Sequence, residues 1–289
     1  IYTLSLHDAL PISVFSLAFF VLTFTHPTGT EIDMLSVGQG DGLGICTREG
    51  QVFMVDGGSS SESELSKYTL LPYFRYRGID RINYWFVTHL DEDHYSGLFE
   101  LLSDGYRVEH VVLAKALEKN EAFYELLKLC EENGTEVVYM ERDDVCGTDS
   151  LRFTCLFPDY PSGFSGTNEN SLCLLLSYGD FDMLLTGDMG EEQELAVLDC
   201  GVMPDIEVLK SAHHGSKNSN CEKWLDAVDP KFAIISAGKN NRYHHPSAET
   251  LERFRERQIP SLCTIDSGEI RIYPDTDGRF AVEGMLDIN

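Results

Sequence analysis

Closely spaced cysteines are absent from this sequence, whose eight cysteines include no C-x-x-C pair. They therefore do not resemble the ligands of a zinc cluster. Cys155 and Cys173 lie inside apolar runs, where a thiol behaves as a small hydrophobic side chain. An even number of cysteines permits disulfides without requiring them, so the count does not identify the cellular compartment.

Basic residues are scarce, with 22 Lys and Arg against 48 Asp and Glu and a formal net charge of -26. An acidic surface repels the phosphate backbone, which counts against tight DNA binding. Residues 205–258 are the exception, with nine basic and eight acidic residues against 13 and 40 in the rest of the chain. Lys210, Lys217, Lys239 and Arg242 lie in this stretch, either as a basic rim around a pocket or as scattered solvated side chains.

No low-complexity linker interrupts the 289 residues, and 43% hydrophobic content supports a sizeable core. Periodic strands and helices continue from Glu31 to the end of the sequence. We therefore expect one domain, residues 31–289, after a non-domain segment of residues 1–30.

The N-terminal segment does not begin with Met, and residues 1–12 carry no fold signal. Residues 13–25 form an uncharged run of thirteen, shorter than the roughly 20 residues that cross a bilayer. The run is typical of a truncated membrane helix or a signal sequence. Either interpretation places the domain beside a membrane, whereas a buried N-terminal segment is the alternative.

The most informative stretch is residues 88–94, which contains five potential metal ligands within six residues. The apolar run before it, residues 82–87, predicts a buried strand, and the segment from Tyr95 can open a helix. The ligands would then lie on a strand-to-helix loop. Imidazole and carboxylate ligands suit zinc, manganese or iron, whereas a solvated acidic turn needs no histidine at both ends.

Strands and helices alternate along the domain, which favours an α/β fold over an all-β fold. We expect strands at residues 31–37, 42–46, 51–55, 82–87, 108–113, 135–140, 151–157, 171–178, 181–186, 206–210, 232–237, 262–264, 270–273 and 279–282. We expect helices at residues 62–77, from 95, and at 116–132, 191–198, 220–227 and 248–258.

The pattern His89-x-Asp91-x-Asp93-His94 resembles the H-x-H-x-D-H signature of the metallo-β-lactamase superfamily, with Asp91 in place of the second histidine. This H-x-D-x-D-H version resembles the C-terminal hydrolase-like domain of the ComEC family, membrane proteins that bring transforming DNA into bacteria. Matching segments occupy residues 36–41, 55–58, 185–188, 210–216 and 241–246, and the similarity runs from about Glu31 to the C-terminus. The resemblance implies an αβ/βα sandwich, two β-rich halves with helices outside.

The resemblance also implies two divalent ions, manganese or zinc. The ligands it implies are His89 and Asp91 for the first ion, Asp93 and His94 for the second, and Asp188 for both. His214 would complete the second site, with His213 as the alternative, because neighbours on an extended chain point to opposite sides.

The first site has fewer nitrogen ligands, because no histidine occurs between His110 and His213. Asn168 stands near the usual position of a further histidine. More oxygen ligands would favour manganese or magnesium there, with zinc at the second site. Asn168, His213 and Asp56 are candidates either to bind a metal or to support a ligand; Asp56 follows a strand and would hold the metal loop from behind.

Two adjacent cations would produce a hydroxide near neutral pH that attacks phosphorus or carbonyl carbon. We expect Asp93 and His245 to take part in catalysis. His245, or His244, could protonate a leaving group or bind phosphate, or else cap the helix after Ser247. Candidates for substrate contact are Gln39, Asp41, Lys210, Ser216, Lys217 and Arg242.

The leading hypothesis is a phosphodiesterase that degrades single-stranded DNA beside a membrane uptake channel, on the extracytoplasmic side of a bacterial membrane. A small-ester hydrolase, for example of phosphocholine esters, is the enzymatic alternative. A lactam is disfavoured because the three-histidine site is missing. A gating or binding domain without turnover is the alternative from another class. Beyond the channel portion of a larger protein, the sequence indicates no stable protein partner.

Overall fold

The computed structural model describes residues 29–201 and 203–286. The interpretations of residues 13–25 as a membrane or signal segment lie outside these residues. Within them, no helix has both the length and the apolar character needed to span a bilayer.

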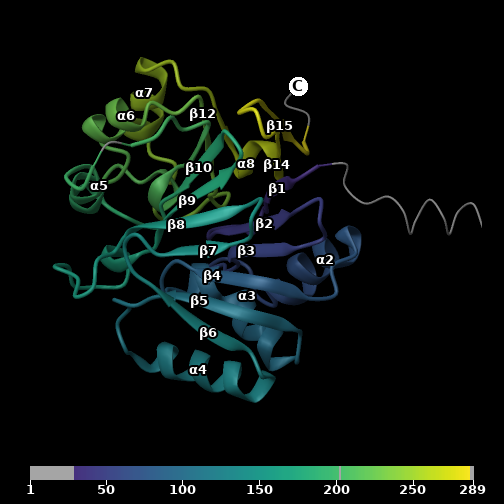
Figure 1. Cartoon of the computed structure of the whole chain (residues 1–289). Helices are drawn as coiled ribbons and strands as arrows, with labels where there is room; N and C mark the ends of the chain where they lie inside the picture. Colours follow the sequence, from purple (N-terminus) through teal and green to yellow (C-terminus); the bar gives the residue numbers. More distant parts are fainter. Residues whose placement is uncertain (1–28, 202, 287–289) are drawn as a thin grey trace, which may run out of the picture.

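Two mixed β-sheets pack face to face, with helices on both outer faces (Figure 1). The first sheet has the order β15-β14-β1-β2-β3-β4-β5-β6. Its strands are β1 (Glu31–Met34), β2 (Gly42–Cys46), β3 (Val52–Asp56), β4 (Ile82–Val87), β5 (Val108–Ala114), β6 (Glu136–Met140), β14 (Ile270–Pro274) and β15 (Phe280–Gly284). The second sheet has the order β13-β12-β11-β10-β9-β8-β7. Its strands are β7 (Val145–Gly147), β8 (Arg152–Phe157), β9 (Cys173–Tyr178), β10 (Phe181–Leu185), β11 (Val208–Lys210), β12 (Phe232–Ile235) and β13 (Ser261–Cys263).

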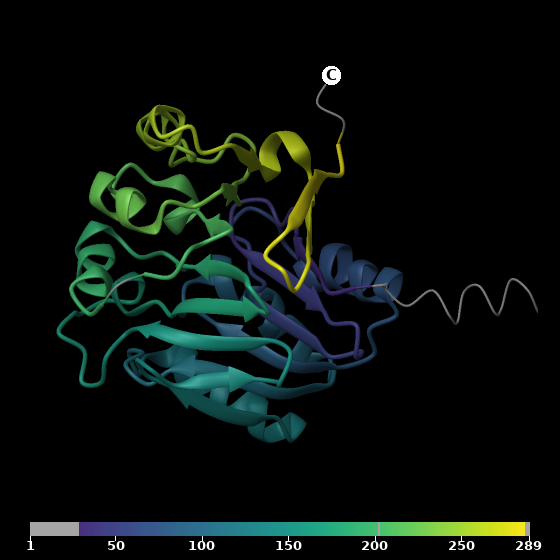
Figure 2. The same cartoon turned by 45° about the horizontal axis from the view of Figure 1, so that its top comes forward.

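The helices divide between the two outer faces, as the turned view shows (Figure 2). The first sheet carries η1 (Ser66–Leu70), α2 (Leu71–Arg77), α3 (Glu92–Ser103) and α4 (Glu121–Asn133), and the second carries α5 (Glu191–Leu198), α6 (Glu222–Val228) and α7 (Ala248–Glu256). The short helices η2 (Asn168–Asn170), η3 (Ala212–Gly215) and α8 (Thr264–Ser267) lie in connections. The expected αβ/βα sandwich is confirmed.

Aromatic side chains join the sheets at the centre of the core. The Phe153 ring of β8 lies 4.4 Å from the Phe86 ring of β4 and 5.4 Å from Phe53 of β3, measured between centroids. All three side chains are fully buried. Burial of this apolar area favours folding and holds the two sheets packed against each other.

Several expected boundaries differ from the structure. Helix α3 begins at Glu92 rather than Tyr95, so two expected loop ligands lie in its first turn. Helix α4 begins at Glu121 rather than Ala116, because the Asn120 side chain accepts a hydrogen bond from Phe123 N and caps the helix there. The three-residue strand β7 was not expected, because so short an edge strand has little periodicity.

The last two strands also differ in position from the expectation. These strands, expected at residues 270–273 and 279–282, follow the strands of the second sheet in the chain, but β14 pairs with β1 of the first sheet in antiparallel register, with Ile32 opposite Ile272. The chain therefore crosses back after β13, and the first sheet contains both the beginning and the end of the domain.

Candidate metal centre

Parallel strand ends bring the candidate ligands together. Strand β4 leads directly into His89, β10 leads through Gly187 to Asp188, and β11 leads into η3 with His213 and His214. Because β10 and β11 run parallel, with Leu185 opposite Lys210, their carboxyl ends meet at one edge of the second sheet. The metal loop of the first sheet faces this edge.

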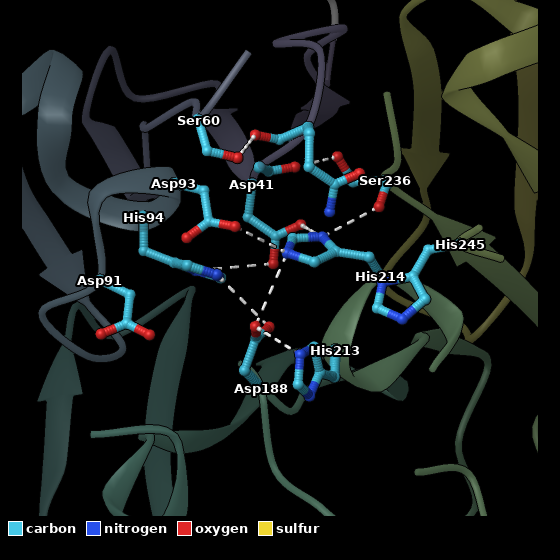
Figure 3. Close-up of polar contacts among 12 residues, drawn as sticks. Asp41, Ser60, Asp91, Asp93, His94, Asp188, His213, His214, Ser236 and His245 are labelled. Carbon is cyan, nitrogen blue, oxygen red and sulfur yellow. Dashed lines mark hydrogen bonds and ion pairs between the residues drawn. The ribbon is translucent and has the colours of Figure 1, made fainter. Parts of the chain in front are cut away.

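Asp188 lies at the centre of the cluster (Figure 3). Its Oδ1 is 3.3 Å from His94 Nε2. Its Oδ2 is 3.6 Å from the Nε2 atoms of both His213 and His214. A second carboxylate, Asp93, places Oδ2 3.5 Å from His214 Nε2. The carboxylate of Asp188 therefore faces three imidazole rings at once.

The donor atoms fit a metal ion. The Nε2 atoms of His89, His94 and His214 and the Oδ1 of Asp188 are buried without a hydrogen-bond partner among the described residues. Buried polar atoms are normally paired, so such a cluster calls for a ligand. The sets His89–His94–Asp188 and Asp93–His94–His214 each bring their ligand atoms within 4.8 Å of one another. Imidazole nitrogens combined with carboxylate oxygens suit zinc, manganese or iron.

Hydrogen bonds from behind orient the histidine rings toward this cluster. His94 Nδ1 donates to Asp56 Oδ2 at 2.9 Å, while the Asp56 carboxylate also accepts from Thr88 N and Oγ1 at 2.8 Å each. His214 Nδ1 donates to the Ser236 carbonyl at 3.0 Å. These bonds leave Nε2 free on both rings, the arrangement expected of metal-binding histidines. The structure thus places Asp56 behind the loop of residues 88–94.

Thr88 and Ser236 are functional contributors that the sequence analysis did not single out. Thr88 directly precedes His89 in the ligand-rich stretch, so its position was a usable signal. Ser236 contributes through its backbone carbonyl, for which a side-chain pattern offers no signal.

The electrostatics of the site favour a positive charge among these rings. Burial alone would lower the pKa of His94, but Asp188 and Asp56 raise it well above the ordinary value. Burial likewise opposes the positive charge of His214, yet Asp188 and Asp41 raise its pKa to about 9. Burial and the neighbouring His94 lower the pKa of His89 to about 3. The carboxylates thus stabilise a cation at the Nε2 atoms of His94 and His214, whether a proton or a metal ion.

Asp91 stands apart from the other ligands (Figure 3). Its Oδ2 is 3.8 Å from His89 Nε2, and its side chain is 42% exposed. Burial raises the pKa of this carboxyl, although the adjacent Thr167 opposes the shift. Asn168 follows Thr167 and accepts from its hydroxyl at 3.2 Å. The first site is therefore less completely assembled than the second in the described part of the chain.

The expectation that only one of the paired histidines can face the metal is wrong. His213 and His214 have φ angles of 49° and 54°, so the backbone here is left-handed rather than extended. Successive side chains in this conformation do not alternate between two faces, and both rings reach Asp188. His214 is buried and also reaches Asp93, whereas His213 is about one-third exposed.

Four expected substrate contacts are buried. Asp41 and Lys210 form an ion pair behind the histidines, with exposed fractions of only 2% and 3%. Burial would raise the pKa of Asp41, but Lys210 and His214 lower it below its ordinary range. Gln39 Oε1 accepts from Gly238 N, and Ser216 Oγ accepts from Asn218 N. Asp41 lies beside His214, and Lys210 is paired with Asp41 in the interior. The expectation that these two side chains contact the substrate is therefore corrected.

The remaining candidates are more accessible to solvent. Lys217 and Arg242 are exposed, and His245 is partly buried. The His245 ring lies 5.5 Å from His213 and 6.2 Å from His214 between centroids, whereas His244 is exposed. His245 is therefore the better placed of the two to meet a substrate.

Known proteins share both sequence and family features with this chain. The family model of the metallo-beta-lactamase superfamily matches residues 44–239. ComE operon protein 3 of Bacillus subtilis (strain 168) is 35% identical over 273 residues, 89% of this chain and 35% of the relative. Recombination protein 2 of Haemophilus influenzae is 29% identical, over 89% of this chain and 30% of the relative, and Competence protein ComA of Neisseria gonorrhoeae is 25% identical, over 80% and 31%. The chain thus spans about a third of the length of these curated relatives.

Solved structures share the fold at low sequence identity. CmlA, a diiron β-hydroxylase from Streptomyces venezuelae, aligns with a TM-score of 0.56 at 16% identity over 88% of this chain and 54% of that one. The metallo-beta-lactamase fold protein YhfI from Bacillus subtilis aligns with a TM-score of 0.54 at 10% identity over 81% and 95%. With the sandwich, the ligand cluster and the family model in agreement, this chain belongs to the metallo-beta-lactamase superfamily.

Proposed function

We propose that this chain is a metal-dependent phosphodiesterase that cleaves single-stranded DNA in a DNA-uptake system. One observation carries the proposal: three buried Nε2 atoms and one Asp188 oxygen converge without any hydrogen-bond partner among the described residues. Groups arranged in this way are costly to fold unless they bind a cation.

Two divalent ions, manganese or zinc, fit the donor set. Asp93, His94, His214 and Asp188 would hold one ion, and His89, Asp91 and Asp188 the other. Bound there, such ions lower the pKa of water and polarise a phosphoryl oxygen. The less assembled first site, with its exposed Asp91 carboxylate, would bind its ion more weakly.

Hydrogen bonds within the chain hold the metal-binding histidines in position. The Asp56 and Ser236 contacts hold the His94 and His214 rings, so little reorganisation is needed when substrate arrives. His245 Nδ1 is buried and has no hydrogen-bond partner within the described residues. We propose that this ring binds a phosphate oxygen at the mouth of the site.

The relatives supply the biological context. Recombination protein 2 and Competence protein ComA carry recombination and competence in their names, which supports DNA as the substrate. That the DNA is single-stranded and that the chain lies beside the membrane, on its extracytoplasmic side, are part of our proposal. In such a setting, the rest of a longer protein would be the membrane channel partner.

A substrate panel tests the proposal. Metal-free protein, supplemented with manganese or zinc, is offered a labelled single-stranded oligonucleotide, bis-p-nitrophenyl phosphate and nitrocefin. We expect metal-dependent turnover of the first two and none of nitrocefin. Tight metal binding without turnover of any of the three would instead favour a gating or binding domain.

A further inference from the structure

A second hollow, away from the metal ligands, is lined by aromatic and basic side chains. It encloses about 420 Å³ between α4, β6 and the connection after β8. Three exposed tyrosines form its walls: Tyr124 at 59%, Tyr139 at 42% and Tyr160 at 52% exposure. Lys115 and Lys119 lie at its rim. We call this hollow the tyrosine groove.

The tyrosine groove opens on the same edge of the first sheet as the metal loop. Strands β4, β5 and β6 run parallel, with Val87 opposite Leu113 and Leu113 opposite Tyr139. Neighbouring strands lie about 4.8 Å apart, so the Tyr139 backbone is roughly 10 Å across the sheet from Val87. His89 follows Val87 by two residues. A short stretch of polymer can therefore reach both the groove and the metal ligands.

One connection between strands contacts both the tyrosine groove and the metal loop. Residues 158–172 join β8 to β9 and carry Tyr160 into the tyrosine groove. Further along, Thr167 lies against the Asp91 carboxylate. Leu172 N then donates to the Thr88 carbonyl of the metal loop at 2.9 Å. The same connection therefore contacts both the groove and the metal loop.

The chemistry of the groove suits nucleobases better than phosphates. Lys115 is paired with Glu141 at 2.6 Å and also lies 4.9 Å over the Tyr160 ring. Lys119 forms no ion pair with another described residue, so it is the single uncompensated cation at the rim. In a chain of net charge -26, attraction for phosphate is small here. Exposed aromatic faces, in contrast, stack on any base regardless of charge.

We propose that the tyrosine groove binds single-stranded nucleic acid by stacking bases on Tyr124, Tyr139 and Tyr160, and so leads the strand to the metal centre. This inference rests on the proposed phosphodiesterase function and adds the element that selects long single strands over small phosphodiesters. Its position beside the centre predicts an effect on substrate affinity rather than on the chemical step.

Binding of a short fluorescent oligothymidylate to the full chain, measured by anisotropy in EDTA to prevent cleavage, tests the groove. The variant combines Tyr124→Ser with Tyr160→Ser. Its control combines Tyr68→Ser with Tyr76→Ser, two tyrosines that are also exposed but lie on η1 and α2. An abasic oligonucleotide with the same number of phosphates serves as the second ligand.

We expect the groove variant to lose about ten-fold or more in affinity for oligothymidylate, since each stacked base is worth roughly a factor of ten. The control should bind like the unmodified chain, and abasic strand should bind weakly to all proteins. With metal restored, the groove variant should hydrolyse bis-p-nitrophenyl phosphate normally while its KM for oligonucleotide rises.

Three binding results would overturn the groove assignment, in addition to the kinetic result given below: no binding by the unmodified chain, equal affinity of groove variant and control, or equal affinity for the abasic strand. A different result would refute the proposed function alone. In that case the chain would bind oligothymidylate through stacking but would hydrolyse no phosphodiester with any metal. Hydrolysis that is unaffected by the groove variant, with unchanged KM, refutes only the groove.

Discussion

Asp188 and His94 face each other across the two halves of the domain, with Oδ1 and Nε2 3.3 Å apart and neither atom otherwise hydrogen-bonded within the described chain. The carboxylate comes from the end of β10 in one sheet, and the imidazole from the first turn of α3 on the other. A cation bound by both side chains would link the two sheets in addition to the packing of their core side chains.

Asp188→Asn keeps the size of the side chain but removes its charge. Since Asp188 is proposed to touch both ions, metal affinity should fall at both sites together, and phosphodiester turnover should fall by orders of magnitude. Metal content and initial rates measure the change. Asp199→Asn, at the exposed end of α5, is the matched control and should leave both unchanged. Full retention of metal and activity by Asp188→Asn would refute the assignment.

Single histidine variants should separate the two sites. His89→Ala should deplete mainly the first ion, and His214→Ala mainly the second, because His214 also reaches Asp93. His213→Ala should have the smaller effect, since the ring is partly exposed and contacts only Asp188 among the proposed ligand carboxylates. His110→Ala, a histidine of β5 outside the site, is the control for isothermal titration with manganese or zinc. A greater loss from His213→Ala than from His214→Ala would reverse the assignment.

Lys210→Met should destabilise the fold, because it leaves the Asp41 carboxylate buried without its partner. Breaking a buried ion pair from one side costs about 3–5 kcal/mol. Urea unfolding of the metal-free protein measures the loss. Lys67→Met, which removes the exposed pair with Glu64, should change stability little. Equal stability of the two variants would show that Lys210 does not compensate Asp41.

Glu194 should give stability a pH dependence. Burial raises the pKa of its carboxyl to about 7, even though the backbone amides of Asn220 and Cys221 donate to it. Between about pH 4.3, the unfolded pKa, and pH 7, the folded protein keeps a proton that the unfolded chain has released. Stability therefore falls as pH rises through this window, by up to about 4 kcal/mol. Glu194→Gln should remove this slope from the urea midpoint; an unchanged slope would assign it to other groups.

The sequence was sufficient for the local parts of the site. The apolar run Ile82–Val87 followed by a dense set of ligands predicts a metal loop at a strand end, and β4 leads into His89 in this way. The Asp188 position after β10 follows from the same rule. These features depend on short-range periodicity, which is readable without tertiary contacts.

The parts that could not be predicted depend on backbone conformation and long-range pairing. The left-handed angles of His213 and His214 are held by the fold, for example by the bond from His213 N to the Gly187 carbonyl at 3.0 Å. Asp41 and Lys210 are far apart in sequence, so their burial against each other follows only from the meeting of the two sheets. The pairing of β14 with β1 likewise depends on tertiary contacts that the local sequence pattern does not contain.

The central claim is that the cluster around Asp188 binds metal ions that carry out phosphodiester cleavage. Its most direct test is the initial rate of cleavage of an end-labelled single-stranded oligonucleotide by metal-free protein, before and after addition of manganese or zinc. We predict no cleavage without metal, restoration on adding it, and no restoration in Asp188→Asn. Cleavage that is independent of metal, or equal restoration in Asp188→Asn, would contradict the account.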